Sequence, residues 1–301
     1  MSSFQSVDQI RPESQSRILR AWKSSRWRNG RFIVSFSVIA LFIIIGGLGP
    51  WIAPFDPYKL LPGQNILQEP NLVHWLGTDE LGRSVLSRMI YGANASLKIG
   101  LFTVGLAVIG GTAFGLTAAY YGGILDMIIM RIMDLVLCLP IMIVIIAIVA
   151  FVGSSINMLI IVIGLLSIPG TARIVYTTAI SIKQAPYIEA ARAIGATDFQ
   201  IIVTHIFPNC IPPLLVHATL SIGFVILTES GLSFLGLGPP PPTPTWGQMI
   251  SVGRIYFYRQ PLLLVSPMLT ISIVILALNI LSDALRDLID PRIRKTTENV
   301  L

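Results

Sequence analysis

The side chains that most often carry out catalysis are few and scattered in this sequence. The three histidines, His74, His205 and His217, lie far apart, and the two cysteines, Cys138 and Cys210, have no CxxC spacing. The motifs GxxxxGK(S/T), HExxH and GxSxG, which place phosphate-binding, zinc-binding and nucleophilic groups, do not occur. We therefore predict no catalytic residue, no cofactor-binding residue and no metal site in this chain.

Ionisable side chains within long apolar stretches are the other candidates, because a charge in an apolar environment is costly and is usually functional. Glu229 lies in such a stretch. Either it lines a translocation path and receives a cationic or polar solute, or neighbouring hydroxyls and helices satisfy its carboxyl group. Arg131 and Asp134 are three residues apart and fall on one helix face. We predict that they form a structural ion pair, with a role in gating as the alternative.

The polar segment 181–210 has the pattern of two short helices that meet at a glycine. Pro186 suits the first turn of a helix, and Glu189 follows in that turn, where a negative charge is favoured. Gly195 is typical of a left-handed helix end. Thr197 then begins a Thr-x-x-Gln capping box, which predicts a second short helix.

Small side chains are frequent in the first of these helices. Its alanines and the one after the glycine would let the surface of another protein approach closely; they are Ala190, Ala191, Ala193 and Ala196. A knob of this kind is suited to docking in the groove of a partner. An ordinary solvated loop is the alternative.

These candidates must be positioned by membrane-spanning helices. Of the 301 residues, 53% are hydrophobic and 12% are charged, whereas a soluble domain carries about 25% charged residues. About 20 apolar residues span a bilayer, and this rule predicts six spans: about 32–52, 97–121, two within 127–176 divided at 153–157, about 213–237, and about 261–281. Within the second span, the stripe Gly111-xxx-Gly115-xxx-Ala119 predicts close helix packing, inside this chain or against a second subunit.

The basic residues indicate the orientation of the chain. Seven of them precede the first apolar run, namely Arg11, Arg17, Arg20, Lys23, Arg26, Arg28 and Arg31. With a cytoplasmic N-terminus, fifteen basic residues lie inside and six outside, as the positive-inside rule favours. We predict that both termini are cytoplasmic. The basic N-terminus is then a membrane flank, and no nucleic-acid partner is expected.

The segment that precedes the second span predicts a short amphipathic helix at the membrane interface. Its apolar side chains fall on one helical face: Leu81, Val85, Leu86, Met89 and Ile90. The polar side chains fall mostly on the opposite face: Arg83, Ser84, Ser87 and Arg88.

The polar segment resembles a known family motif. Glu189, Ala190 and Ala191, followed by Gly195 and by the sequence Ile-Phe-Pro-Asn at 206–209, resemble the EAA loop of binding-protein-dependent ABC importer permeases. The isoleucine of the usual Ile-x-Leu-Pro ending is displaced, and a phenylalanine stands for the leucine. In that family the loop is the coupling helix that seats on the ATPase subunit. The resemblance therefore implies a coupling role for Glu189, Ala190, Ala191 and Gly195.

The outer segment narrows the resemblance. Residues 74–92 are similar to the LGTDxLGRDxxSRxIYGA signature of the C-type permeases of dipeptide, oligopeptide and nickel importers, with Ser84 in place of the usual aspartate. Further matches extend to residue 292. The resemblance implies an all-α, polytopic protein with six transmembrane helices, in which a type I ABC importer permease core is preceded by one extra helix.

The expected organisation follows from the spans and the resemblance together. It comprises a cytoplasmic basic N-terminus (1–31), a first transmembrane helix (32–54), an extracytoplasmic loop with an amphipathic helix (55–95), a five-helix core that includes the coupling loop 181–210 (96–284), and a cytoplasmic tail (285–301).

The resemblance also implies a function and partners. The chain would be a pore-forming subunit, not an enzyme, that moves peptides or a related small solute across the bacterial inner membrane by alternating access. The expected partners are a second homologous permease, two ATPase subunits that bind ATP and Mg, an extracytoplasmic solute-binding protein and membrane lipid. The alternatives are a secondary transporter or channel driven by an ion gradient and, more distantly, a membrane enzyme.

Overall fold

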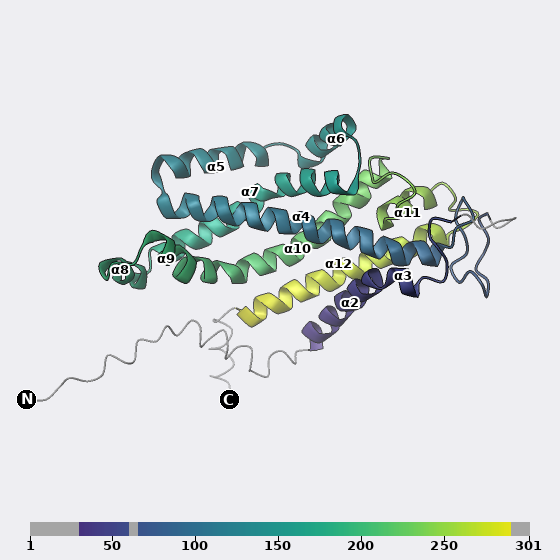
Figure 1. Cartoon of the computed structure of the whole chain (residues 1–301), viewed down its shortest axis with the longest axis horizontal. Coiled ribbons are helices and arrows are strands. Elements are labelled where there is room, and N and C mark those ends of the chain that lie inside the picture. Colours follow the sequence, from purple (N-terminus) through teal and green to yellow (C-terminus); the bar gives the residue numbers. More distant parts are fainter. Residues whose placement is uncertain (1–29, 60–65, 290–301) are drawn as a thin grey trace, which may run out of the picture.

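The structure is a computed structural model that describes residues 30–59 and 66–289 (Figure 1). Within these ranges the chain is helical, and its sole β-type pairing is an isolated bridge between Thr78 and Ser84. The helices are α2 (Gly30–Gly47), α3 (Gly49–Ile52), α4 (Val85–Tyr121), α5 (Gly123–Leu137), α6 (Ile141–Val152), α7 (Ile156–Lys183), α8 (Pro186–Ala193), α9 (Asp198–Ile201), the π-helical turn η3 (Ile202–Ile206), α10 (Phe207–Phe234), α11 (Trp246–Gly253) and α12 (Leu262–Ile289). The predicted basic N-terminus and most of the predicted C-terminal tail lie outside the described residues.

The prediction of an all-α polytopic protein is confirmed. Five helical segments are long and apolar enough to cross a membrane: Gly30–Gly47, Val85–Tyr121, Ile156–Lys183, Asp198–Phe234 and Leu262–Leu288. Helices α5 and α6 together make a sixth candidate, but their axes differ by 83°. Counting this bent pair as one span gives the six crossings that the sequence predicts.

The third predicted span consists of two helices, α5 and α6, and not of one continuous helix. Helical structure is interrupted at residues 138–140. Pro140 is the N-cap of α6 and has an extended backbone conformation. Proline has no N–H for the helical ladder and disfavours helical geometry in the residue before it, Leu139. The apolar composition continues through this break, so hydropathy alone does not reveal it.

Helix α4, 37 residues long, lies at the centre of the bundle and packs along α7 (Figure 1). The predicted stripe of small residues makes this contact. A Cβ added at Gly111 would lie 2.6 Å from Cβ of Thr171, and one added at Gly115 would lie 2.6 Å from the carbonyl oxygen of Ala172. The close packing predicted for the second span is therefore confirmed, and it takes place within this chain.

The fifth span is longer than predicted. Helical structure runs without interruption from Asp198 through η3 to Phe234, whereas the sequence analysis placed a separate short helix before the span. Pro208 cannot donate the usual backbone hydrogen bond. The wider π-helical turn lies immediately before Phe207 and Pro208, and such turns insert into helices without ending them.

The two ends of the bundle carry different structures (Figure 1). Helices α8 and α9 lie at one end, which is also the end where α12 finishes and α2 begins. Helix α11 and the loop 66–84 lie at the other end. Helix α2 packs against α12 and α4 at the edge of the bundle, and the side-chain amide of Asn94 donates a 2.8 Å hydrogen bond to the carbonyl oxygen of Gly46.

Candidate coupling site and membrane residues

The predicted corner at Gly195 is present. Helix α8 ends at Ala193, and Gly195 adopts a φ of +87°, which is accessible to glycine and strained for residues with a Cβ. The N–H of Gly195 donates to the carbonyl of Arg192 at 3.0 Å, and the N–H of Ala196 donates to that of Ala191 at 3.1 Å. This pair of hydrogen bonds is the Schellman motif, which closes a helix on a left-handed residue.

The predicted capping box is also present and starts α9. The hydroxyl of Thr197 accepts from the N–H of Gln200 at 3.3 Å, and the side-chain oxygen of Gln200 accepts from the N–H of Thr197 at 2.9 Å. Two reciprocal bonds of this kind satisfy amides that the first helical turn otherwise leaves unpaired. The corner is therefore held by hydrogen bonds between its own residues.

One face of α8 is anchored in the membrane bundle. Ile188 is 1% exposed and Ala191 is 7% exposed, and both belong to an apolar cluster with residues of α4, α7, α9 and α10. Glu189, Ala190 and Gly195 are exposed. The prediction that Ala191 contributes to a partner-facing surface is corrected, because its small side chain lets α8 approach its own bundle.

Large apolar side chains project from the corner into solvent. Ile194 is 87% exposed and Phe199 is 74% exposed, one on each side of Gly195. The sequence analysis did not single them out, because apolar residues are common in this chain and neither falls in the family motif. Exposed apolar groups at the tip of an otherwise polar loop are typical of a protein interaction surface.

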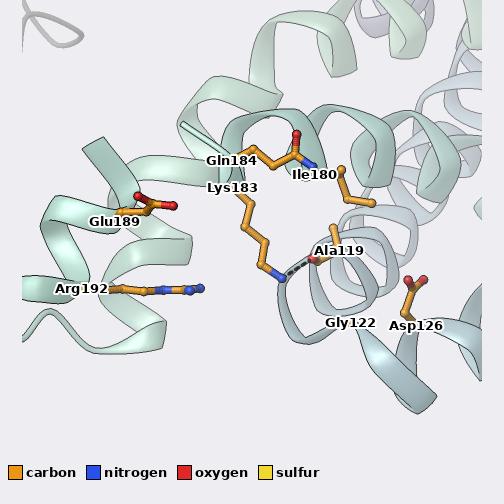
Figure 2. Close-up of a pocket in the computed structure, with 8 residues that line it drawn as sticks. All are labelled: Ala119, Gly122, Asp126, Ile180, Lys183, Gln184, Glu189 and Arg192. Atoms are coloured by element: carbon orange, nitrogen blue, oxygen red, sulfur yellow. Dashed lines mark hydrogen bonds between the residues drawn. The ribbon is translucent and has the colours of Figure 1, made fainter. Parts of the chain in front are cut away.

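A pocket of about 360 Å³ lies between α8 and the ends of the neighbouring helices. Figure 2 shows Glu189 and Arg192 pointing toward it from α8, with Asp126 on its opposite side. Lys183 crosses it to the end of α4, where its ammonium group donates to the carbonyl oxygens of Ala119 at 3.2 Å and Tyr120 at 2.6 Å. The pocket therefore separates α8 from the start of α5.

Glu229 lies at the contact between α10 and α11. Its side chain is 1% exposed, and one carboxyl oxygen accepts hydrogen bonds from the hydroxyls of Ser233 and Thr245, both at 2.8 Å. A Cβ on Gly247 would lie 2.9 Å from the other oxygen, so a glycine is needed for α11 to pack here. Two hydroxyls therefore satisfy one oxygen of the carboxyl group, as the second alternative expects, while among the described residues the other oxygen is buried without a hydrogen-bond partner.

The predicted pair of Arg131 and Asp134 is corrected. Asp134 on α5 forms its ion pair with Arg173 on α7, and among the described residues no ion pair links it to Arg131, which is exposed. Sequence spacing identifies only neighbours on the same helix. Because α5 packs against α7, a charge from the second helix comes within reach.

The outer segment forms a buried ionic network that the sequence analysis missed. Asp79 is 1% exposed, and Arg83 and Arg88 are 4% and 3% exposed. One oxygen of Asp79 accepts from Nε of Arg83 at 2.7 Å and lies 3.3 Å from Nε of Arg88. Its other oxygen accepts from the backbone N–H of Leu81 at 3.0 Å and from that of Arg83 at 2.8 Å. The carboxylate therefore holds together a tight turn and the start of α4.

Residues around the network extend it to other elements. Glu80 accepts from Arg83 at 3.0 Å, and burial together with the adjacent Asp79 raises the pKa of the Glu80 carboxyl group. Arg88 donates to the side chain of Gln248 on α11 at 3.3 Å, and Gln260 donates to the carbonyl of Gln68 at 2.7 Å. The loop 66–84, here called the outer loop, is thus attached to α4 and to the residues that precede α12, and Arg88 links α4 to α11.

The predicted amphipathic helix is wrong in extent and in exposure. Residues 79–84 form a turn, and α4 begins at Val85 and continues through the second span without a break, so the expected boundary at 95–96 falls inside one helix. The polar residues of this segment are buried: Arg83 and Arg88 contact Asp79, and the hydroxyl of Ser87 accepts from the backbone N–H of Phe55 at 3.1 Å. Ser84 is the N-cap of α4 and accepts from the N–H of Ser87. An aspartate, usual here in the family that the sequence resembles, would cap equally well.

The fold has a known counterpart. A chain of the inward-facing MetNI methionine ABC transporter matches with a TM-score of 0.54 at 20% identity, over 67% of this chain and 96% of that chain. A second crystal form of the same transporter matches with a TM-score of 0.50. The helical core therefore has the fold of an ABC transporter permease.

The sequence comparisons give the family. Residues 111–295 match the model of the binding-protein-dependent transport system inner membrane component, and the chain belongs to this family. It is 38% identical to the dipeptide transport system permease protein DppC of Alkalihalophilus pseudofirmus, over 94% of both chains. It is 40% identical to the glutathione transport system permease protein GsiD of Escherichia coli O6:K15:H31, over 91% of this chain and 90% of that protein.

These matches confirm the predicted relationship to ABC importer permeases of the peptide family. The chain is therefore a transport component of a bacterial inner membrane and crosses that membrane several times. Members of the family work in complexes with ATPase and substrate-binding partners.

Proposed function

We propose that this chain passes short peptides, or a closely related small solute, into the cytoplasm through a path that it forms with a second, homologous permease. The relatives named for dipeptide and glutathione transport support this solute class, since both solutes are short, amide-linked and charged at their ends. ATP and Mg would be bound by two ATPase subunits, and the solute would be delivered by an extracytoplasmic binding protein.

The observation that carries the proposal is the geometry of α8. Its inner face, with Ile188 and Ala191, is buried against the membrane helices, while Ile194 after α8 and Phe199 in α9 are exposed on the two sides of Gly195. A force applied by a partner at the tip would reach the spans through packed side chains, since packed interiors transmit displacement. We infer that Glu189, Ala190 and Gly195 shape the surface on which the ATPase subunit seats, and that Ala191 positions it.

Apolar side chains cover much of the outer surface of the bundle. Ile109, Ile124 and Phe151 are 72%, 74% and 93% exposed, an arrangement suited to lipid or to a second membrane subunit. A transporter driven by an ion gradient is not favoured, because the relatives are components of binding-protein-dependent systems and Glu229 is enclosed between helices.

Reconstitution tests the proposal directly. In proteoliposomes, the chain alone is expected to hydrolyse no ATP and to accumulate neither a radiolabelled dipeptide nor glutathione. With the second permease, the ATPase subunits and a solute-loaded binding protein, uptake should appear and should require ATP. Uptake by the chain alone, driven by an ion gradient without nucleotide, would establish the secondary-transporter alternative.

The orientation is tested by thiol labelling in cells, in a variant from which Cys138 and Cys210 are removed. A cysteine at Leu72, which is 97% exposed in the loop 66–84, should react with an impermeant reagent added outside. One at Ile194, which is 87% exposed, should react after the membrane is permeabilised, because the fifteen-to-six distribution of basic residues favours a cytoplasmic position. Labelling of the Ile194 position in intact cells would reverse the proposed topology.

A further inference from the structure

The corner at Gly195, between α8 and α9, is here called the coupling corner. The side chain of Tyr120 contacts each segment that meets there. It is the penultimate residue of α4 and is 5% exposed. It lies in the apolar cluster that also contains Ile188 of α8 and Ile201 of α9. This tyrosine is not among the residues selected from the sequence.

Two cations lie near its ring. The ammonium nitrogen of Lys183, at the end of α7, is 5.7 Å from the ring centroid, and the guanidinium carbon of Arg192, in the last turn of α8, is 5.4 Å from it. Both distances are within the range of cation–π attraction. Lys183 also donates to the carbonyl oxygen of Tyr120 at 2.6 Å. The end of α7 is therefore attached to the end of α4 through both the main chain and the ring of Tyr120.

The hydroxyl of Tyr120 donates to the carboxylate of Asp198 at 2.5 Å. Asp198 is the first residue of α9, which leads without a break into α10. A hydrogen bond to a charged acceptor is among the stronger ones in proteins. Tyr120 is therefore attached to both arms of the corner, by Arg192 before Gly195 and by Asp198 after it.

The remaining attachments of α8 are few. Ile188 and Ala191 are its buried residues, and the pocket of about 360 Å³ separates its polar side from the start of α5. The buried face of α8 transmits displacement through Ile188 and Ala191, but on its polar side the pocket could take up a displacement unless a side chain links this side to the spans. Tyr120 provides this link, since it joins α8, α9 and α7 to the long central helix α4.

We propose that Tyr120 is a positioning residue that makes α4 and α10 move together with the coupling helix when the ATPase subunits close. This role rests on the proposed function and names the residue that passes the movement of α8 to α4 and α10. The phenol has two separable parts: the ring holds Arg192 and Lys183, and the hydroxyl holds Asp198. Tyr120→Phe removes the second part and keeps the first, together with the packing of the cluster.

The test is the ratio of solute transported to ATP hydrolysed, measured in proteoliposomes that contain the complete complex. Tyr120→Phe should lower this ratio several-fold while ATP hydrolysis continues, because the ATPase cycle no longer drives the spans fully. Tyr121→Phe is the matched control: this neighbouring tyrosine is 57% exposed, and the ratio should stay at the wild-type value. Assembled complex should be recovered in equal amounts for both variants.

Asp198 supplies a second test through a double-mutant cycle. Asp198→Ala should lower the ratio as Tyr120→Phe does, and the double variant should be no worse than either single variant, because the same hydrogen bond is lost in each. An unchanged ratio in Tyr120→Phe, or additive losses in the double variant, would overturn the proposed role while leaving the transport function intact. Absence of ATP-dependent uptake by the wild-type complex would instead contradict the proposed function itself.

Discussion

A Gly195→Val variant is expected to lose most transport although it inserts into the membrane and assembles. Gly195 has a φ of +87°, where a residue with a Cβ costs about 1–2 kcal/mol and a β-branched one is a genuine outlier. A Cβ at this position would meet no atom within 4 Å. The effect therefore arises from backbone conformation alone, which would rotate α8 relative to α9 and displace the surface carried by Ile194 and Phe199.

A graded comparison separates this mechanism from a general defect. Asparagine tolerates the left-handed region better than other residues with a Cβ, so Gly195→Asn should retain much more transport than Gly195→Val. A cysteine at the exposed Ala193 should crosslink to the ATPase subunit in the wild-type background and less in Gly195→Val. Equal transport by the valine and asparagine variants, at equal protein levels, would show that the corner does not position the docking surface.

An Asp79→Ala variant is expected to destabilise the protein more than any other single carboxylate substitution in the outer loop. It leaves Arg83 and Arg88 buried at 4% and 3% exposure without the carboxylate that both contact. Removal of one partner from a buried ion pair costs about 3–5 kcal/mol. It also removes the acceptor for the backbone N–H groups of Leu81 and Arg83, so the turn before α4 should open.

The loss of stability is measured by thermal unfolding of the detergent-solubilised protein. Size-exclusion chromatography after heating reports how much folded protein remains at each temperature. The control is Asp56→Ala, because Asp56 also lies between α3 and α4 but is exposed. Its carboxylate accepts a local hydrogen bond from the N–H of Tyr58 at 2.8 Å. Asp56→Ala should unfold close to the wild-type temperature, since exposed charges contribute little. Similar unfolding temperatures for Asp79→Ala and Asp56→Ala would mean that the network is not a structural support of the outer loop.

Local signals in the sequence predicted the coupling corner well, because each depends on a few adjacent residues. Pro186 at the helix start, Gly195 at the left-handed position and the Thr197 capping box all have the predicted geometry. Contacts between helices could not be predicted in this way. The sequence suggested Arg131 for Asp134, whereas α7 supplies Arg173, and no spacing rule links Tyr120 to Asp198, 78 residues apart.

The outer loop illustrates the same limit. The spacing of Asp79 and Arg83, four residues apart, was a signal for an ion pair that the sequence analysis did not use. That spacing alone favours a helix with an exposed pair. The structure instead forms a turn whose carboxylate accepts backbone hydrogen bonds, because neighbouring elements cover the segment and exclude water from its charges.

The sequence by itself determined the membrane class, the corner at Gly195 and the family, since hydropathy, capping residues and motifs are properties of contiguous segments. Tertiary structure decided which polar groups in those segments are paired: Glu229 with two hydroxyls, Asp134 with Arg173, and Tyr120 with both arms of the corner. The physical reason is that a buried charge is stable only when a partner lies within hydrogen-bonding distance. That distance is set by how the helices pack, and not by how far apart the residues lie along the chain.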